Sequence, residues 1–183
     1  MERTIAGRSG SPAALLLHPG DDSLPHSIAL LLLRVVAGGA MMLHGAPKIV
    51  APTSWMGESA VPGLLQLLAA VAEFAGGLAW MLGLLTPVAA AGVVVTMATG
   101  ILIGHVAVGD PLIRLTVTGD PSGSGAPWGG LPVWLVRADG RGAPGSGSSE
   151  LALLYLGIGV ILACVGAGRF SLDRVLTRRR SER

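Results

Sequence analysis

The sequence alternates between four long apolar runs and shorter polar segments. The runs cover about 27–46, 63–85, 87–108 and 151–167. An α-helix rises about 1.5 Å per residue, so about 20 apolar residues suffice to cross the hydrocarbon core of a bilayer. The pattern therefore predicts an all-α fold, an integral membrane bundle of four transmembrane helices.

The segments outside the runs complete the expected domain organisation. Residues 1–26 form a polar N-terminal tail, and its apolar piece is too short for the core of a signal peptide. Residues 109–149 form a long external loop, because 20 of these 41 residues are Gly, Pro or Ser, too many for a regular spanning element. We therefore expect a transmembrane domain at 27–167 and a basic tail at 168–183.

The composition and the placement of basic residues agree with a membrane environment. Of all residues, 51% are hydrophobic and only 13% are charged, whereas soluble domains carry about 25% charged residues. Six of the 13 basic residues lie between Arg169 and Arg183. Such clusters mark the cytoplasmic side of membrane proteins. We therefore expect both termini in the cytoplasm and the lipid bilayer, rather than nucleic acid, as the partner of this basic chain.

Two ionisable residues interrupt the apolar runs near the middle of the membrane, where charge is costly and usually faces the bundle interior. From the helix rise, Arg34 lies about 10 Å and Glu73 about 18 Å from the cytoplasmic side. A salt bridge between them would fix the register of the two helices, or Arg34 would extend to the inner interface instead. Glu73 also shares a small, polar stripe that should face other helices, together with Gln66, Ala69, Ala70, Gly76 and Gly77.

A second polar level is expected toward the outer face. His44 and His105 fall at matching depths of about 25 and 27 Å, close to Gln66, and Lys48 and Glu150 cap this end. Such groups could handle protons, bind a quinone carbonyl or bind a small anion. Two histidines could also ligate a metal, but no HxxH or ExxH spacing occurs on one helix, so we predict no metal site.

These two levels supply the candidate functional residues. Candidate catalytic residues are Glu73, His44 and His105. Candidate contacts for a quinone or an anion are Arg34, Lys48, Gln66 and Glu150. No Rossmann, Walker or CxxCH motif occurs, so no haem, flavin or metal cofactor is predicted. The single cysteine, Cys164, can form neither an intramolecular disulfide nor a redox pair, and we interpret it as a small buried apolar residue.

An ordered set of short motifs follows the four runs: Leu33-Arg34, His44-Gly45 with Lys48, Glu73 to Gly77, Gly83 to Thr86, His105, Glu150-Leu151 and Gly168 to Asp173. Across 28–176 this set resembles the DoxX family of bacterial membrane proteins. The resemblance implies a multi-pass, four-helix bundle in the bacterial inner membrane. It also implies a link to redox chemistry, since some relatives are membrane subunits of a thiosulfate:quinone oxidoreductase and others are associated with thiol or oxidative-stress defence.

Three functions remain open from the sequence. The chain could be the membrane component of a quinone-linked oxidoreductase, which would need a partner subunit to supply electrons. It could be a non-catalytic scaffold that anchors soluble redox enzymes through its basic tail or outer loop. It could also be a small-molecule carrier, although four helices without an evident internal repeat make this reading weaker. The sequence indicates no oligomeric state.

Overall fold

The fold is taken from a computed structural model of the chain, which describes residues 23–115, 132–138 and 147–181. Most of the expected N-terminal tail and a large part of the expected 109–149 loop lie outside these residues. The chain divides into two compact units, each described by itself: the first unit is Met1–Ala91 with Ile161–Arg183, and the second unit is Gly92–Val160.

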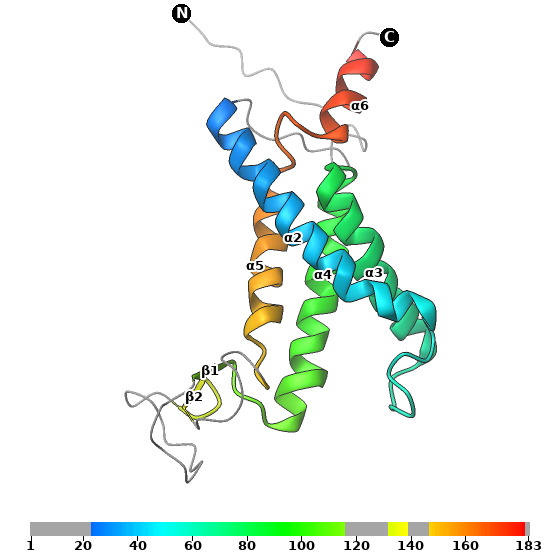
Figure 1. The fold of residues 1–183 in the computed structure, drawn as a ribbon, viewed down its shortest axis with the longest axis vertical. Coiled ribbons are helices and arrows are strands. Elements are labelled where there is room, and N and C mark those ends of the chain that lie inside the picture. Colours follow the sequence, from blue (N-terminus) through cyan, green and yellow to red (C-terminus); the bar gives the residue numbers. More distant parts are fainter. Residues whose placement is uncertain (1–22, 116–131, 139–146, 182–183) are drawn as a thin grey trace, which may run out of the picture. The chain divides into compact units, whose positions relative to one another are not determined.

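The described residues are mostly helical (Figure 1). In chain order the elements are α2 (Leu24–Val50), α3 (Gly63–Leu82), α4 (Thr86–Thr99), the π-helix η1 (Gly100–His105), the 3₁₀-helix η2 (Val106–Val108), β1 (Ile113–Leu115), β2 (Val136–Ala138), α5 (Glu150–Val165) and α6 (Leu172–Ser181).

Three helical stretches of the described chain are long and apolar enough to cross a membrane: Leu24–Val50, Gly63–Leu82 and Thr86–Val108. The fourth apolar run forms the shorter helix Glu150–Val165. The expected membrane character and helical fold are therefore confirmed in the three longer stretches. The first of them extends beyond the expected span at both ends: it begins at Leu24, with Pro25 in its first turn, and it continues through Pro47 to Val50.

In the first unit, α2 and α3 lie side by side and run in opposite directions (Figure 1). Their backbones touch at glycines. A Cβ atom on Gly77 would lie 2.5 Å from the amide nitrogen of Met42 and 2.6 Å from the carbonyl oxygen of Gly38. Gly45 likewise faces the backbone of Phe74. Small residues permit this approach, which replaces hydrophobic driving force with close van der Waals packing inside a membrane.

The expected polar stripe on α3 faces the interior of the first unit. Five of its six residues are buried, namely Gln66, Ala70, Glu73, Gly76 and Gly77, while Ala69 is half-buried. The prediction that this stripe faces other parts of the protein is therefore confirmed, and the glycines within it explain why α2 can come so close.

The turn between α3 and α4 is closed by a residue from the far end of the sequence. Gly83 ends α3 in the left-handed conformation with φ of +62°. Asp173 then accepts hydrogen bonds from the backbone amides of Leu85 at 2.7 Å and Thr86 at 3.0 Å. The first amides of a helix have no partner within the helix, so Asp173 caps α4 from α6.

In the second unit, the end of the long apolar stretch changes from α-helix to π-helix and then to 3₁₀-helix. Two short strands follow, β1 and β2, which pair in parallel with Ile113 opposite Val136. The glycine, proline and serine content of this loop predicted no strand. The pairing forms because the amide of Ile113 donates to the carbonyl of Leu135, which ties two loop segments together.

Replacing Gly77 with alanine should destabilise the first unit. The added methyl group would collide with the α2 backbone rather than with a flexible side chain, and overpacking of this kind costs about 1–3 kcal/mol. Gly39→Ala is the matched control, since its Cβ would lie 3.8 Å from the sulfur of Met81, an ordinary contact. Thermal unfolding in detergent should show a lower Tm for Gly77→Ala only. Equal Tm values would mean that the two backbones do not touch.

Candidate functional site

A buried ion pair joins α2 to α3. The ammonium nitrogen of Lys48 lies 2.5 and 2.6 Å from the two carboxylate oxygens of Glu73. The Glu73 side chain is only 4% exposed, whereas that of Lys48 is 23% exposed. The Glu73 carboxylate is thus enclosed by the protein. The Lys48 ammonium is partly exposed, so a second group could approach it.

Trp55 completes this site from the segment between α2 and α3. The Lys48 ammonium lies 4.4 Å from the centre of the Trp55 ring, a geometry in which the electron-rich face of the ring attracts a cation. The indole nitrogen of Trp55 donates to the backbone carbonyl of Gln66 at 3.0 Å. We call Lys48, Trp55 and Glu73 the Lys48–Glu73 site.

Gln66 holds the segment that carries Trp55. Its side-chain oxygen accepts a hydrogen bond from the amide of Met56 at 3.0 Å, and its side-chain nitrogen donates to the carbonyl of Val61 at 2.9 Å. Gln66 was predicted as a ligand contact. In the structure its amide group is engaged by the backbone, so it positions Trp55 instead.

Arg34 does not pair with Glu73, and the predicted salt bridge between them is wrong. The depth estimate assumed that both helices begin and end at the same membrane level. In the structure Arg34 instead reaches Trp80, which lies seven residues, or about 10 Å, along α3 from Glu73. The glycine contacts set this register, and they bring Lys48 rather than Arg34 to the carboxylate.

The buried guanidinium of Arg34 is satisfied by backbone carbonyls. Its Nε donates to Trp80 at 2.8 Å, and its Nη1 donates to Ala167. Its Nη2 donates to Met81 at 3.2 Å and Phe170 at 3.0 Å. The last carbonyls of a helix lack intrahelical partners, so Arg34 caps α3 and at the same time ties α2 to the segment between α5 and α6.

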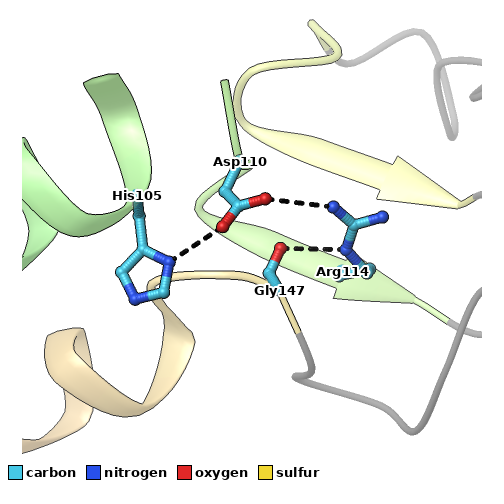
Figure 2. A network of polar contacts seen from close by, with 4 residues as sticks. All are labelled: His105, Asp110, Arg114 and Gly147. Carbon is cyan, nitrogen blue, oxygen red and sulfur yellow. Dashed lines mark hydrogen bonds and ion pairs between the residues drawn. The ribbon is translucent and has the colours of Figure 1, made fainter. Parts of the chain in front are cut away.

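A separate polar network lies within the second unit (Figure 2). Nδ1 of His105 lies 3.1 Å from one carboxylate oxygen of Asp110, and Nη2 of Arg114 lies 3.4 Å from the other. Nε of Arg114 donates to the carbonyl of Gly147 at 2.9 Å. An ionised carboxylate only accepts hydrogen bonds, so Nδ1 of His105 is the donor in this contact. This arrangement orients an imidazole for proton exchange.

The remaining candidates occupy different surroundings. His44 is on the exposed side of α2, and Glu150 begins α5 at a half-buried position. Cys164 is exposed, so the expectation of a buried cysteine is wrong; on an apolar helix an outward-facing position suits a small apolar side chain equally well. Within the described residues, no group of three or more His, Cys, Asp or Glu side chains could hold a metal ion.

Three functional residues were not predicted: Trp55, Asp110 and Asp173. Each lies outside the apolar runs, where depth in the membrane gives no guidance. For Asp110 a signal was available, since it follows His105 by five residues and precedes Arg114 by four. Trp55 and Asp173 act on partners that only the fold brings near them.

Arg34→Gln should lower the free energy of unfolding by about 3–5 kcal/mol, because buried carbonyls would lose a charged donor that no neighbour replaces. Arg169→Gln is the control, since Arg169 is exposed and its guanidinium lies over the Phe170 ring. Unfolding in mixed micelles measures both variants. A loss below 1 kcal/mol for Arg34→Gln would show that the guanidinium is not what holds these segments together.

One comparison with known proteins places part of the chain. Residues 29–106 match the family model described as DoxX. Neither the comparison with curated proteins nor that with solved structures gives a match. The matched segment contains α2 from Ala29 onward, α3 and α4, and with them the Lys48–Glu73 site, Arg34 and His105. Residues 29–106 of this membrane protein are thus similar to the DoxX family.

Proposed function

We propose that this protein is the membrane component of a quinone-linked oxidoreductase system and that the Lys48–Glu73 site binds the quinone head group. The observation that carries the proposal is the buried Glu73 carboxylate, held by an ammonium group that also contacts an aromatic ring. Buried charge within a membrane-spanning helix is expensive and usually marks a functional position.

The chemistry of this site suits a quinone. A quinone has carbonyl oxygens that accept hydrogen bonds and a flat ring that stacks on aromatic side chains. Lys48 has three donor hydrogens, and Glu73 supplies two acceptor atoms. The third hydrogen is therefore available to a carbonyl oxygen, while Trp55 offers a stacking surface. Glu73 lies within 2.6 Å of the ammonium and could exchange a proton with the bound ring.

The reaction class follows from the atoms that must balance. A quinone accepts two electrons and two protons to become a quinol. Two thiols supply both when they join as a disulfide, so the sum is quinone plus two thiols giving quinol plus disulfide. Thiosulfate supplies electrons without protons, which would then come from water. The single cysteine of this chain cannot complete a redox pair, so the reductant, or a soluble redox enzyme that carries it, is a partner.

His105 adds a second group able to exchange protons. Its ring is held by Asp110, whose other carboxylate oxygen faces Arg114. About a third of its side chain is exposed, so protons can reach Nε2. We assign this network to proton exchange with the surroundings.

The membrane arrangement that we propose has four spans, with both termini in the cytoplasm of a bacterial cell. The support is a contact in the first unit. The amide of Arg169, beyond α5, donates to the hydroxyl of Ser27 near the start of α2 at 3.2 Å. A contact between the start of α2 and the segment after α5 supports an even number of crossings between them. Since three stretches are long and apolar enough to span, we propose α5 as the fourth crossing.

Binding of a short-chain ubiquinone analogue to the purified protein in lipid nanodiscs tests the proposal. We expect wild-type protein to bind it and Lys48→Met to lose at least tenfold in affinity. Glu73→Gln should retain part of the binding but slow quinone reduction by thiosulfate or a thiol in native membranes at least tenfold, because a carboxylate that exchanges protons is removed.

Two further variants keep the test decisive. Glu58→Gln removes an exposed carboxylate from the same connecting segment and should change nothing. The double variant Lys48→Met/Glu73→Met removes both buried charges, so it should fold but not bind. Unchanged quinone binding in Lys48→Met would overturn the proposal. Unchanged reduction by every variant, with loss of a co-purifying redox enzyme, would support the scaffold function instead.

A further inference from the structure

We propose that α6 is an interfacial helix that docks on anionic lipid headgroups through an exposed apolar face and the arginines beside it. The apolar face consists of Leu172, Val175 and Leu176. These positions are spaced by three and four residues, so they lie on one side of the helix. Their exposed fractions are 41%, 46% and 43%, which is unusual for three large apolar side chains on a helix that also carries charge.

The opposite side of α6 is attached to the protein. Asp173 is fully buried, and its own amide donates to the carbonyl of Gly83 at 2.9 Å. Ser171 begins the helix, because its hydroxyl accepts a hydrogen bond from the amide of Arg174. The first turn is thus fixed, and the apolar face is the side that the protein leaves open.

These attachments place the first turn of α6 at the end of the membrane-spanning helices. Asp173 bonds to the turn that joins α3 to α4, and the preceding residue Arg169 bonds to Ser27 in the first turn of α2. Nearby on α2, Ile28 and Leu32 are 44% and 62% exposed, as expected of side chains that contact lipid. The apolar face of α6 therefore starts at the depth where hydrocarbon gives way to headgroups.

The positive charge of α6 favours binding to anionic lipids. The helix contains four arginines, at positions 174, 178, 179 and 180, and one acid, Asp173. With Asp173 counted, the helix still carries three more basic than acidic residues. Guanidinium groups bind phosphate with two parallel hydrogen bonds, and basic residues next to a membrane are attracted to anionic headgroups. An apolar face with arginines beside it is the pattern of a helix that lies in the interface.

An acidic soluble protein is the other occupant that such a surface could take. The attachment at the membrane boundary favours lipid, because a soluble partner would have to displace headgroups to reach Leu172 in the first turn. The surface is also independent of the Lys48–Glu73 site, since no residue is shared.

Fluorescence of a polarity-sensitive probe at position 176 tests this proposal on the full chain. The exposed Cys164 is first replaced in Cys164→Ala, and Leu176→Cys then carries the probe. The protein is reconstituted in vesicles of phosphatidylcholine alone or mixed with phosphatidylglycerol. With phosphatidylglycerol we expect a blue-shifted emission that lipids with brominated acyl chains quench. Thr177→Cys lies on a different side of the helix from Leu176 and keeps every arginine, so it should give a probe that these lipids do not quench.

The contribution of charge is measured with Leu176→Cys as the reporter. Arg178→Gln should lower the ratio of docked to undocked helix about fivefold, and Arg178→Lys should preserve it. Added salt should weaken docking. An unquenched probe at position 176 in phosphatidylglycerol vesicles would overturn the proposal. So would equal quenching with and without anionic lipid, and so would quenching that appears only in vesicles that also contain an acidic soluble partner.

Discussion

The burial of one guanidinium group organises the first unit. Arg34 is 1% exposed, and a charge in such a place is tolerated only when its donors are satisfied. Its partners come from the end of α3 and from the segment that follows α5. Because these segments must converge on one side chain, the position of Arg34 determines where three parts of the chain meet.

The meeting of these segments at Arg34 also explains why a glycine occupies position 83 and an aspartate position 173. A Cβ on Gly83 would lie 2.8 Å from the guanidinium carbon of Arg34, so only glycine leaves room for the arginine at this turn. Asp173 then satisfies the amides that the turn exposes. Buried polar groups need hydrogen-bond partners within the protein, so the arginine, the glycine and the aspartate form one connected arrangement.

The sequence indicated the helices and the inward-facing stripe well, because both depend on local periodicity. Which charged residues pair with each other was harder to predict from the sequence. Arg34 and Glu73 are the two most central charges in the runs, and depth alone suggested that they meet. Their true partners depend on the register of α2 against α3, which is set by backbone contact at Gly38, Gly45 and Gly77. The seven-residue spacing of Gly38 and Gly45 carried that information, but choosing between registers requires both helices at once.

The polar residues thus separate into groups with different freedom. The side chains of Arg34 and Gln66 are hydrogen-bonded to backbone atoms. Neither can turn toward a ligand without breaking bonds that hold the fold together. Lys48 and Glu73 bond mainly to each other, and the lysine remains partly exposed. Only one ring nitrogen of His105, Nδ1, is bonded to Asp110 in the described part of the chain. Chemistry is therefore expected where a polar side chain is positioned but still has an atom to offer.

The cap on α4 has a consequence for biosynthesis. Asp173 is translated 87 residues after Thr86, when α2, α3 and α4 have already left the ribosome. Until then, the first amides of α4 lack the acceptor that the finished protein provides. A nascent chain consequently enters the membrane with one helix end unfinished, and the arrival of α6 completes that end.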